Sequence, residues 1–191
     1  MIRTSFIVLR RTPFKESGLV IAGLSPDCGR VDLIVKGART IGRKKFPVYE
    51  LFRELAIQFN EPKNEGLVSP RSVEPLAEFD AIAKNPEGYL AACEHAAFVL
   101  RHSRQMLPCP ESYEALKAML SRLASNSCDA KKAVALAKLA FLEESGLVPE
   151  GVDPELLESA AGRIPPPQFD DAYWKRMTDW IDGLASWHGL K

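Results

Sequence analysis

One stretch decides the fold class of the N-terminal part of the chain: Gly29-Arg30-Val31-Asp32-Leu33-Ile34-Val35-Lys36-Gly37-Ala38-Arg39. Val31, Leu33 and Val35 alternate with other residues, most of them charged. This alternation predicts a β-strand with one buried face and one cationic face. Glycines and cations continue to residue 45, a composition that favours contact with phosphates over packing in a core. The stretch therefore predicts a nucleic-acid platform, a strand that leads into a basic loop.

The charges are unevenly distributed although the formal net charge is zero. Residues 1–45 carry a net charge of +7, and residues 46–191 carry −7. Binding to a polyanion depends on the potential of a local patch, so a neutral total does not exclude it. The N-terminal part is expected to face nucleic acid, and a merely solvated basic face is the alternative.

Composition indicates a globular chain of 191 residues, 46% of them hydrophobic, which is enough to bury a core. No apolar run approaches the roughly 20 residues of a membrane span, and no secretory signal is recognisable. We therefore expect a cytoplasmic protein. Its cysteines, Cys28, Cys93, Cys109 and Cys128, are scattered singly, which predicts reduced thiols and no metal site.

The pattern of apolar residues changes near residue 76. Before it, runs bounded by turn residues predict five strands, at residues 3–11, 18–25, 30–37, 48–59 and 66–74, the inventory of a small β-barrel. After it, helices are expected to begin at Pro86, Pro110, Asp129, Asp153 and Asp170. In the first helix, Leu90, Cys93, Ala97 and Leu100 form the expected buried stripe. We expect an α+β chain with a barrel domain at 1–76 and a helical domain at 77–191.

This organisation resembles RecO, the family of bacterial recombination mediators. Quotable residues carry the resemblance: the opening strand Ile2-Arg3-Thr4 with Phe6-Ile7-Val8-Leu9-Arg10, the turn Glu16-Ser17, the stretch from Gly29 to Arg39, and the helix end Glu144-Ser145-Gly146-Leu147-Val148-Pro149. The resemblance covers roughly residues 1–150.

The resemblance implies a five-stranded OB-fold followed by helices, no enzymatic activity and no cofactor. It also implies binding of single- and double-stranded DNA, annealing of complementary strands, and partnership with RecR and the single-strand-binding protein. Many family members hold a structural zinc with four cysteines just after the helix end, whereas this chain has no cysteine after Cys128. The zinc site is therefore not expected here, and residues 150–191 depart from the family pattern.

An OB surface follows the DNA backbone with cations and stacks bases on aromatic rings. The expected DNA-binding residues are Arg10, Arg11, Phe14, Lys15, Arg30, Lys36, Arg39, Arg43, Lys44, Lys45 and Phe46. Phe14 and Phe46 stand among cations in expected loops, where each is either a base platform or a packing anchor. Phe6, Phe52 and Phe59 lie inside strand patterns and are expected to be buried. The phosphate contacts imply binding without sequence specificity.

On the third helix, Lys131, Lys132 and Lys138 are the expected contacts for the acidic, apolar tail of the single-strand-binding protein. An enzyme or metal site is not expected: His95 and His102 share a helix with Cys93 and Glu94, but their spacing matches no motif. Two alternatives to the DNA mediator stay open. One is a protein–protein scaffold whose OB domain has reduced DNA affinity, and the other is an OB-type RNA-binding protein.

Overall fold

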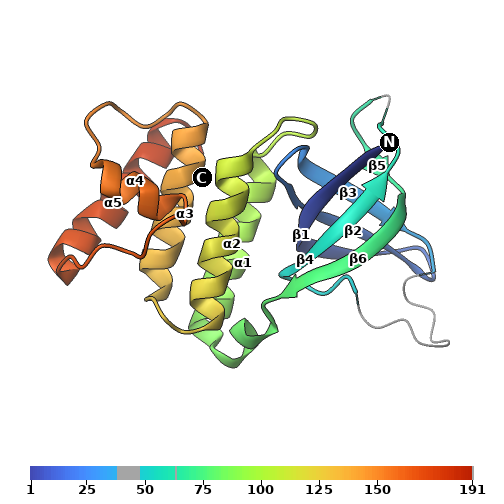
Figure 1. Ribbon diagram of the computed structural model, residues 1–191, viewed down its shortest axis with the longest axis horizontal. Helices are drawn as coiled ribbons and strands as arrows, with labels where there is room; N and C mark the ends of the chain where they lie inside the picture. The colour runs from blue at the N-terminus through green and yellow to red at the C-terminus, as the bar shows by residue number, and fades with distance from the viewer. Residues whose placement is uncertain (38–47, 63, 191) are drawn as a thin grey trace. The chain divides into compact units, whose positions relative to one another are not determined.

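The structure is a computed structural model that describes residues 1–37, 48–62 and 64–190. Two compact units divide the chain: residues 1–80 with 99–109 form the first, and residues 81–98 with 110–191 form the second. In chain order the described elements are β1 (Ile2–Phe14), β2 (Gly18–Ser25), β3 (Gly29–Val35), β4 (Arg53–Phe59), β5 (Leu67–Val68), β6 (Pro70–Glu78), η1 (Asp80–Lys84), α1 (Pro86–His102), α2 (Pro110–Ala124), α3 (Ala130–Glu144), α4 (Pro154–Ala160) and α5 (Asp171–Trp187) (Figure 1).

The strands form one six-stranded sheet in the order β5-β3-β2-β1-β4-β6. Neighbours are antiparallel except β3 and β5, which are parallel. The strands at the two ends of this order, β5 and β6, are separated in the chain by Ser69 alone. A flat sheet would hold these ends about 24 Å apart, whereas one residue spans less than about 4 Å. The sheet must therefore curl until its ends approach each other, as the ribbon shows (Figure 1).

The expectation of a five-stranded barrel is corrected by the structure. The described sheet has six strands, and its first and last strands, β5 and β6, are not hydrogen-bonded neighbours in the sheet order. The expected strand at 66–74 is divided at Ser69 into β5 and β6, which pair with different neighbours. The expected strand at 48–59 begins only at Arg53, because the chain turns at Leu51 and Phe52. Phe52 has a φ of 62°, which a strand cannot accommodate, and its backbone N–H donates to Val8 O over 2.8 Å.

The core of the first unit lies inside the curled sheet, and Phe6 and Phe59 fill its centre as expected. Its buried residues are Phe6, Val8, Leu19, Ile21, Cys28, Val31, Leu33, Leu55, Ile57, Phe59 and Val68. Gly23 makes room for Phe6, because a Cβ there would lie 2.1 Å from Ile7 O and within 2.6 Å of the Phe6 ring. Phe52 is also buried, as predicted.

The helices of the second unit begin where the sequence predicts. The side chains of Asp129, Asp153 and Asp170 accept hydrogen bonds from the backbone N–H groups of α3, α4 and α5. Of the expected stripe in α1, Leu100 is buried as predicted, but Leu90 is 60% exposed. The buried face of this helix carries Ala92, His95, Ala96 and Val99. Small side chains on this face allow close packing: Gly88 lies near a Leu123 methyl group of α2.

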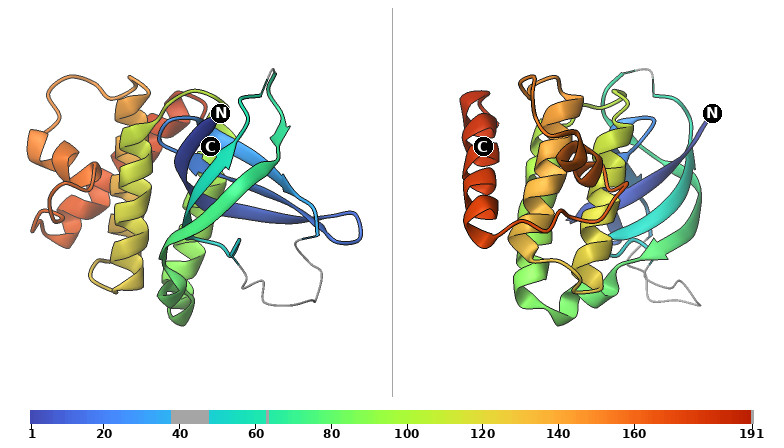
Figure 2. Two further views of the ribbon diagram at one scale, coloured as in Figure 1. Left: turned by 45° about the vertical axis from the view of Figure 1, so that its right-hand side comes forward. Right: turned by 60° about the vertical axis from the view of Figure 1, so that its left-hand side comes forward.

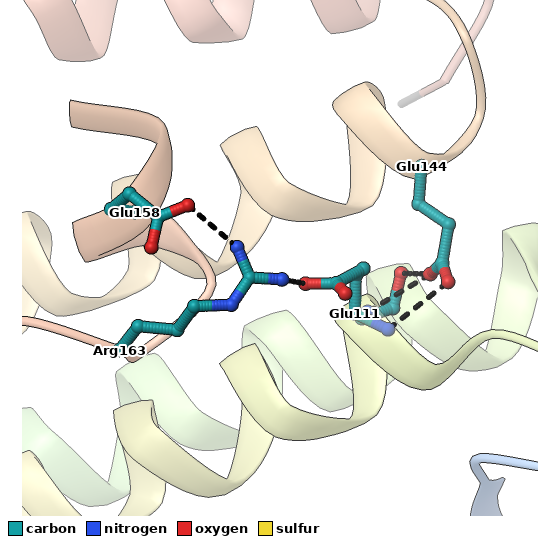
Figure 3. A network of polar contacts seen from close by, with 5 residues as sticks. Glu111, Glu144, Glu158 and Arg163 are labelled. Carbon is teal, nitrogen blue, oxygen red and sulfur yellow. Dashed lines mark hydrogen bonds and ion pairs between the residues drawn. The ribbon is translucent and has the colours of Figure 1, made fainter. Parts of the chain in front are cut away.

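Glu144 and Arg163 tie three helices of the second unit together (Figure 3). The Glu144 carboxylate, at the end of α3, accepts from Glu111 N and Ser112 N over 3.0 and 2.9 Å, so it caps the start of α2. Arg163 forms ion pairs with Glu111 of α2 and Glu158 of α4. The Glu-Ser-Gly helix end quoted from the sequence therefore contains a capping residue for the neighbouring helix.

Candidate nucleic-acid interface

The β1–β2 hairpin carries four of the residues expected to bind DNA. The sequence predicts that the first strand ends at residue 11 and that Phe14 lies in a loop, which is wrong: β1 continues to Phe14 and pairs with β2 from Arg10 opposite Ala22 to Phe14 opposite Gly18. Pro13 is tolerated because β4 pairs only with residues 2–7 of β1, so this half of β1 has a free edge. The result is a long two-stranded arm of the sheet (Figure 2).

At the end of this arm, Phe14 and Lys15 form a small cationic and aromatic group. Phe14 is half-buried, and its ring lies over Gly18, where a Cβ would be 3.5 Å from the ring. The Lys15 ammonium lies 5.4 Å from the centre of the same ring. Arg10 shares the strand face of Phe14, since side chains alternate along a strand, and it is exposed. Arg11 is on the other face and is ion-paired with Glu50.

Lys36 is exposed at the same end of the sheet. It follows Val35, which pairs with Leu19 of β2, and the preceding residue Gly18 pairs with Phe14. The ends of three neighbouring strands therefore place Phe14, Lys15 and Lys36 at the same end of the sheet. Among the described residues, Arg10, Lys15 and Lys36 have no carboxylate partner.

The expected residues Arg39, Arg43, Lys44, Lys45 and Phe46 lie outside the described residues, in the segment that joins Gly37 to Val48.

Arg30 has a different environment from the other expected cations. Its side chain is 28% exposed and is ion-paired with Asp32 over 2.9 Å. A second guanidinium nitrogen donates to Leu100 O over 3.0 Å. The expectation of a solvent-exposed cationic face along β3 is therefore wrong at Arg30 and Asp32, because the segment 99–109 covers this part of the strand.

The segment 99–109 joins the sheet through backbone and side-chain hydrogen bonds. Arg30 N donates to Arg104 O over 3.0 Å, and Met106 N donates to Cys28 O over 2.8 Å. The Gln105 side chain donates to Asp32 over 2.7 Å and accepts from Gly66 N over 2.7 Å. Sequence reasoning missed this segment, because a contact between residues about 70 positions apart has no local signal.

A family model described as recombination protein O N terminal matches residues 1–79. These residues belong to the RecO N-terminal domain family. The RecO N-terminal domain is an OB-fold, and its match spans the whole described sheet, from β1 to β6. RecO proteins act in DNA recombination and repair. No curated protein sequence matches this chain significantly.

The motif that carries the RecO resemblance, Gly29-Arg30, is also the place where the segment 99–109 joins the domain. Gly29 has a φ of 61°, and a Cβ there would lie 2.2 Å from Leu107 O and 2.4 Å from Arg104 O. The motif therefore holds a chain segment that lies beyond the 79 residues of the RecO match.

The expected partner contacts on α3 differ from one another. Lys131 is exposed and has no ion-pair partner among the described residues, whereas Lys132 and Lys138 are half-buried and paired with Asp171 and Asp182 of α5. The hydrogen bond that Lys132 donates to Asp171 raises the pKa of Lys132. Two of the three lysines are thus already in contact with acidic groups.

The described residues contain no group of three or more His, Cys, Asp and Glu side chains placed to hold a metal ion. All four cysteines are free, and burial raises the pKa of the Cys28, Cys93 and Cys128 thiols, so they stay protonated near neutral pH. None of the described helices combines the length and apolar character that crossing a membrane requires.

Proposed function

We propose that this chain is a non-enzymatic DNA-binding mediator of recombination and repair. In this proposal it binds single- and double-stranded DNA, promotes annealing of complementary strands, and works with RecR and the single-strand-binding protein. One observation supports DNA contact most directly: Arg10 and Lys15 on the β1–β2 arm, and Lys36 at the end of β3, are exposed and have no carboxylate partner in the part of the chain that the structure describes. They belong to a RecO N-terminal domain, and the Lys15 ammonium lies over the half-buried Phe14 ring.

The proposed chemistry of binding is electrostatic. Each cation that neutralises a phosphate releases a counterion, so affinity depends on salt and not on base sequence. The Phe14 ring offers a surface for one base, a contact worth about 1–3 kcal/mol in proteins of this kind. A protein that holds two strands by their phosphates leaves their base edges free to pair, which accounts physically for annealing.

The ion pairs of the first unit support the scaffold alternative. Arg11, Arg30 and Arg53 are paired with Glu50, Asp32 and Asp80, so three cations of the first unit are already in contact with carboxylates. If phosphate binding needs these guanidinium groups, DNA affinity will be low and protein partners become the main ligands.

A fluorescence-anisotropy titration with an unstructured oligonucleotide tests the proposal. We expect the full chain to bind, and the Arg10→Ala, Lys36→Ala double variant to bind more weakly with a smaller salt slope. The control is Lys84→Ala, Lys175→Ala, which removes two exposed cations of the second unit. An equal loss in both doubles contradicts the assigned surface.

The same titration with an RNA oligomer of identical sequence separates the nucleic-acid alternatives. Tighter binding of RNA supports the RNA-binding alternative, because the 2′-hydroxyl is the group that distinguishes the two polymers. Absence of binding to both polymers at low salt supports the scaffold.

A further inference from the structure

The C-terminal helix α5 lies along α3, and both ion pairs of its Asp171 and Asp182 are made with α3 lysines (Figure 2). Lys132 Nζ is 2.9 Å from Asp171 Oδ1, and Lys138 Nζ is 2.5 Å from Asp182 Oδ1. The two aspartates are about three helical turns apart on α5, whereas the two lysines are less than two turns apart on α3. Two carboxylates of α5 therefore lie against two ammonium groups of α3.

Apolar side chains of α5 accompany these two ion pairs. Trp174, Ile181 and Ala185 are the buried residues of this helix. The Lys132 ammonium lies 5.7 Å from the centre of the Trp174 ring, so the same lysine contacts both an acidic and an aromatic group. The surface of α3 thus holds a segment that combines carboxylates with apolar residues.

Two features distinguish α5 from α3. Only three of its residues are buried, against nine in α3. Asp171 and Asp182 are 96% and 54% exposed, and ion pairs at such positions are screened by salt.

We propose that the α3 surface around Lys132 and Lys138 is a binding site for an acidic segment with apolar side chains, and that α5 is its resident occupant. A partner of this chemistry then binds by displacing α5. The inference rests on the proposed function in one respect, the use of α3 for partner docking. It adds that docking is autoinhibited, since a tethered helix competes at the high effective concentration of an intramolecular ligand.

The chain itself supplies the probe, a fluorescein-labelled peptide of residues 168–190 added to the full-length protein. In the Asp171→Asn, Asp182→Asn variant the tethered helix loses its ion pairs, so we expect the peptide to bind about threefold to tenfold more tightly than to the parent. The control is Glu150→Gln, Asp179→Asn, which neutralises two exposed carboxylates that have no partner among the described residues. Adding Lys132→Gln and Lys138→Gln to the first variant should abolish the gain.

Hydrogen exchange gives a second readout on the same proteins. We expect amides of α5 to exchange faster than those of α2 and α3, and faster still in the Asp171→Asn, Asp182→Asn variant, with α3 unchanged. Unchanged peptide affinity in that variant overturns the proposal. So does exchange of α5 and α3 as one unit, because α5 is then a permanent part of the fold.

The outcome is separable from that of the DNA titration. If the Asp171→Asn, Asp182→Asn variant binds the peptide more tightly but the protein binds no DNA, the α3 site is supported and the nucleic-acid function is contradicted. If the protein binds DNA but the variant gains no peptide affinity, the proposed function is supported and the autoinhibition is contradicted.

Discussion

The guanidinium of Arg30 lies 2.9 Å from the carboxylate of Asp32, two residues along the same strand. Asp32 is 8% exposed and also accepts a hydrogen bond from Gln105. Arg30 in turn donates to Leu100 O. The pair therefore joins β3 to the segment 99–109, and a cation that the sequence assigns to DNA has a structural role.

Replacing Arg30 should reduce stability more than DNA affinity. The Arg30→Ala change leaves Asp32 nearly buried without its main partner, so we expect a loss of about 1–3 kcal/mol in the free energy of unfolding. Urea denaturation measures this loss. The control is Arg3→Ala, because Arg3 and Glu74 are 3.5 Å apart and both exposed, and a surface pair contributes about 0–1 kcal/mol. Parent-like stability together with a large loss of DNA affinity would show that Arg30 is a phosphate ligand.

Replacing Gly29 should displace the segment 99–109. A Cβ at this position would lie 2.2 Å from Leu107 O, and backbone atoms cannot move aside without breaking their hydrogen bonds. Gly146→Ala is the matched control, since its φ of 69° is similar and nothing lies within 4 Å of its Cβ. The positive φ alone costs about 1 kcal/mol. We expect Gly29→Ala to lose clearly more than Gly146→Ala in thermal denaturation, with faster hydrogen exchange at Met106 and Cys109. Equal losses of thermal stability in the two variants would show that only the positive φ, and not contact with the segment 99–109, destabilises Gly29→Ala.

His95 should make the helical unit sensitive to acid. Burial, and secondarily the charge of Lys138, lowers the pKa of His95 to about 3, and its Nδ1 has no hydrogen-bond partner in the described structure. The unfolded chain takes up this proton below about pH 6.5 and the folded chain does not, so stability falls as the pH falls from 6.5 toward 3. At pH 5 the loss from this group is about 2 kcal/mol.

The test for His95 compares unfolding at pH 7 and pH 5, a window above the range in which most carboxylates titrate. His95→Gln removes the titrating group and should remove most of the loss, whereas His188→Gln, at an exposed histidine, should not. The same pH dependence in all three proteins would assign the acid sensitivity to other groups.

The basic segment after Gly37 should control the salt dependence of DNA binding. This prediction rests on sequence, because Arg39, Arg43, Lys44 and Lys45 lie outside the described residues. Their replacement by alanine should weaken binding to all sequences alike and reduce the slope of log affinity against log salt by about 0.7 per lost contact on a single strand. Anisotropy titrations at several salt concentrations measure the slope. Unchanged affinity would exclude this segment from the interface, provided that the melting temperature is also unchanged.

The sequence by itself determined several of the elements and the order of strands before helices. Alternation of apolar residues located β2 and β3, and the aspartates at 129, 153 and 170 located three helix starts, because these signals act between residues a few positions apart. The RecO resemblance also came from local motifs, and the match to residues 1–79 confirms it. The continuation of β1 from Thr12 to Phe14 was missed, since Pro13 and the neighbouring cations resemble a loop when the pairing with β2 is unknown.

Only the tertiary structure decided which charges are free. Arg30 and Lys36 occupy equivalent places in the sequence pattern of one strand, yet Arg30 is held by Asp32 and Leu100 while Lys36 is exposed. Likewise, the α3 lysines gained partners from α5, about 40 residues away in the chain. The availability of a cation depends on which distant carboxylates and carbonyl groups the fold brings within hydrogen-bond distance, and periodicity and composition contain no information about those distances.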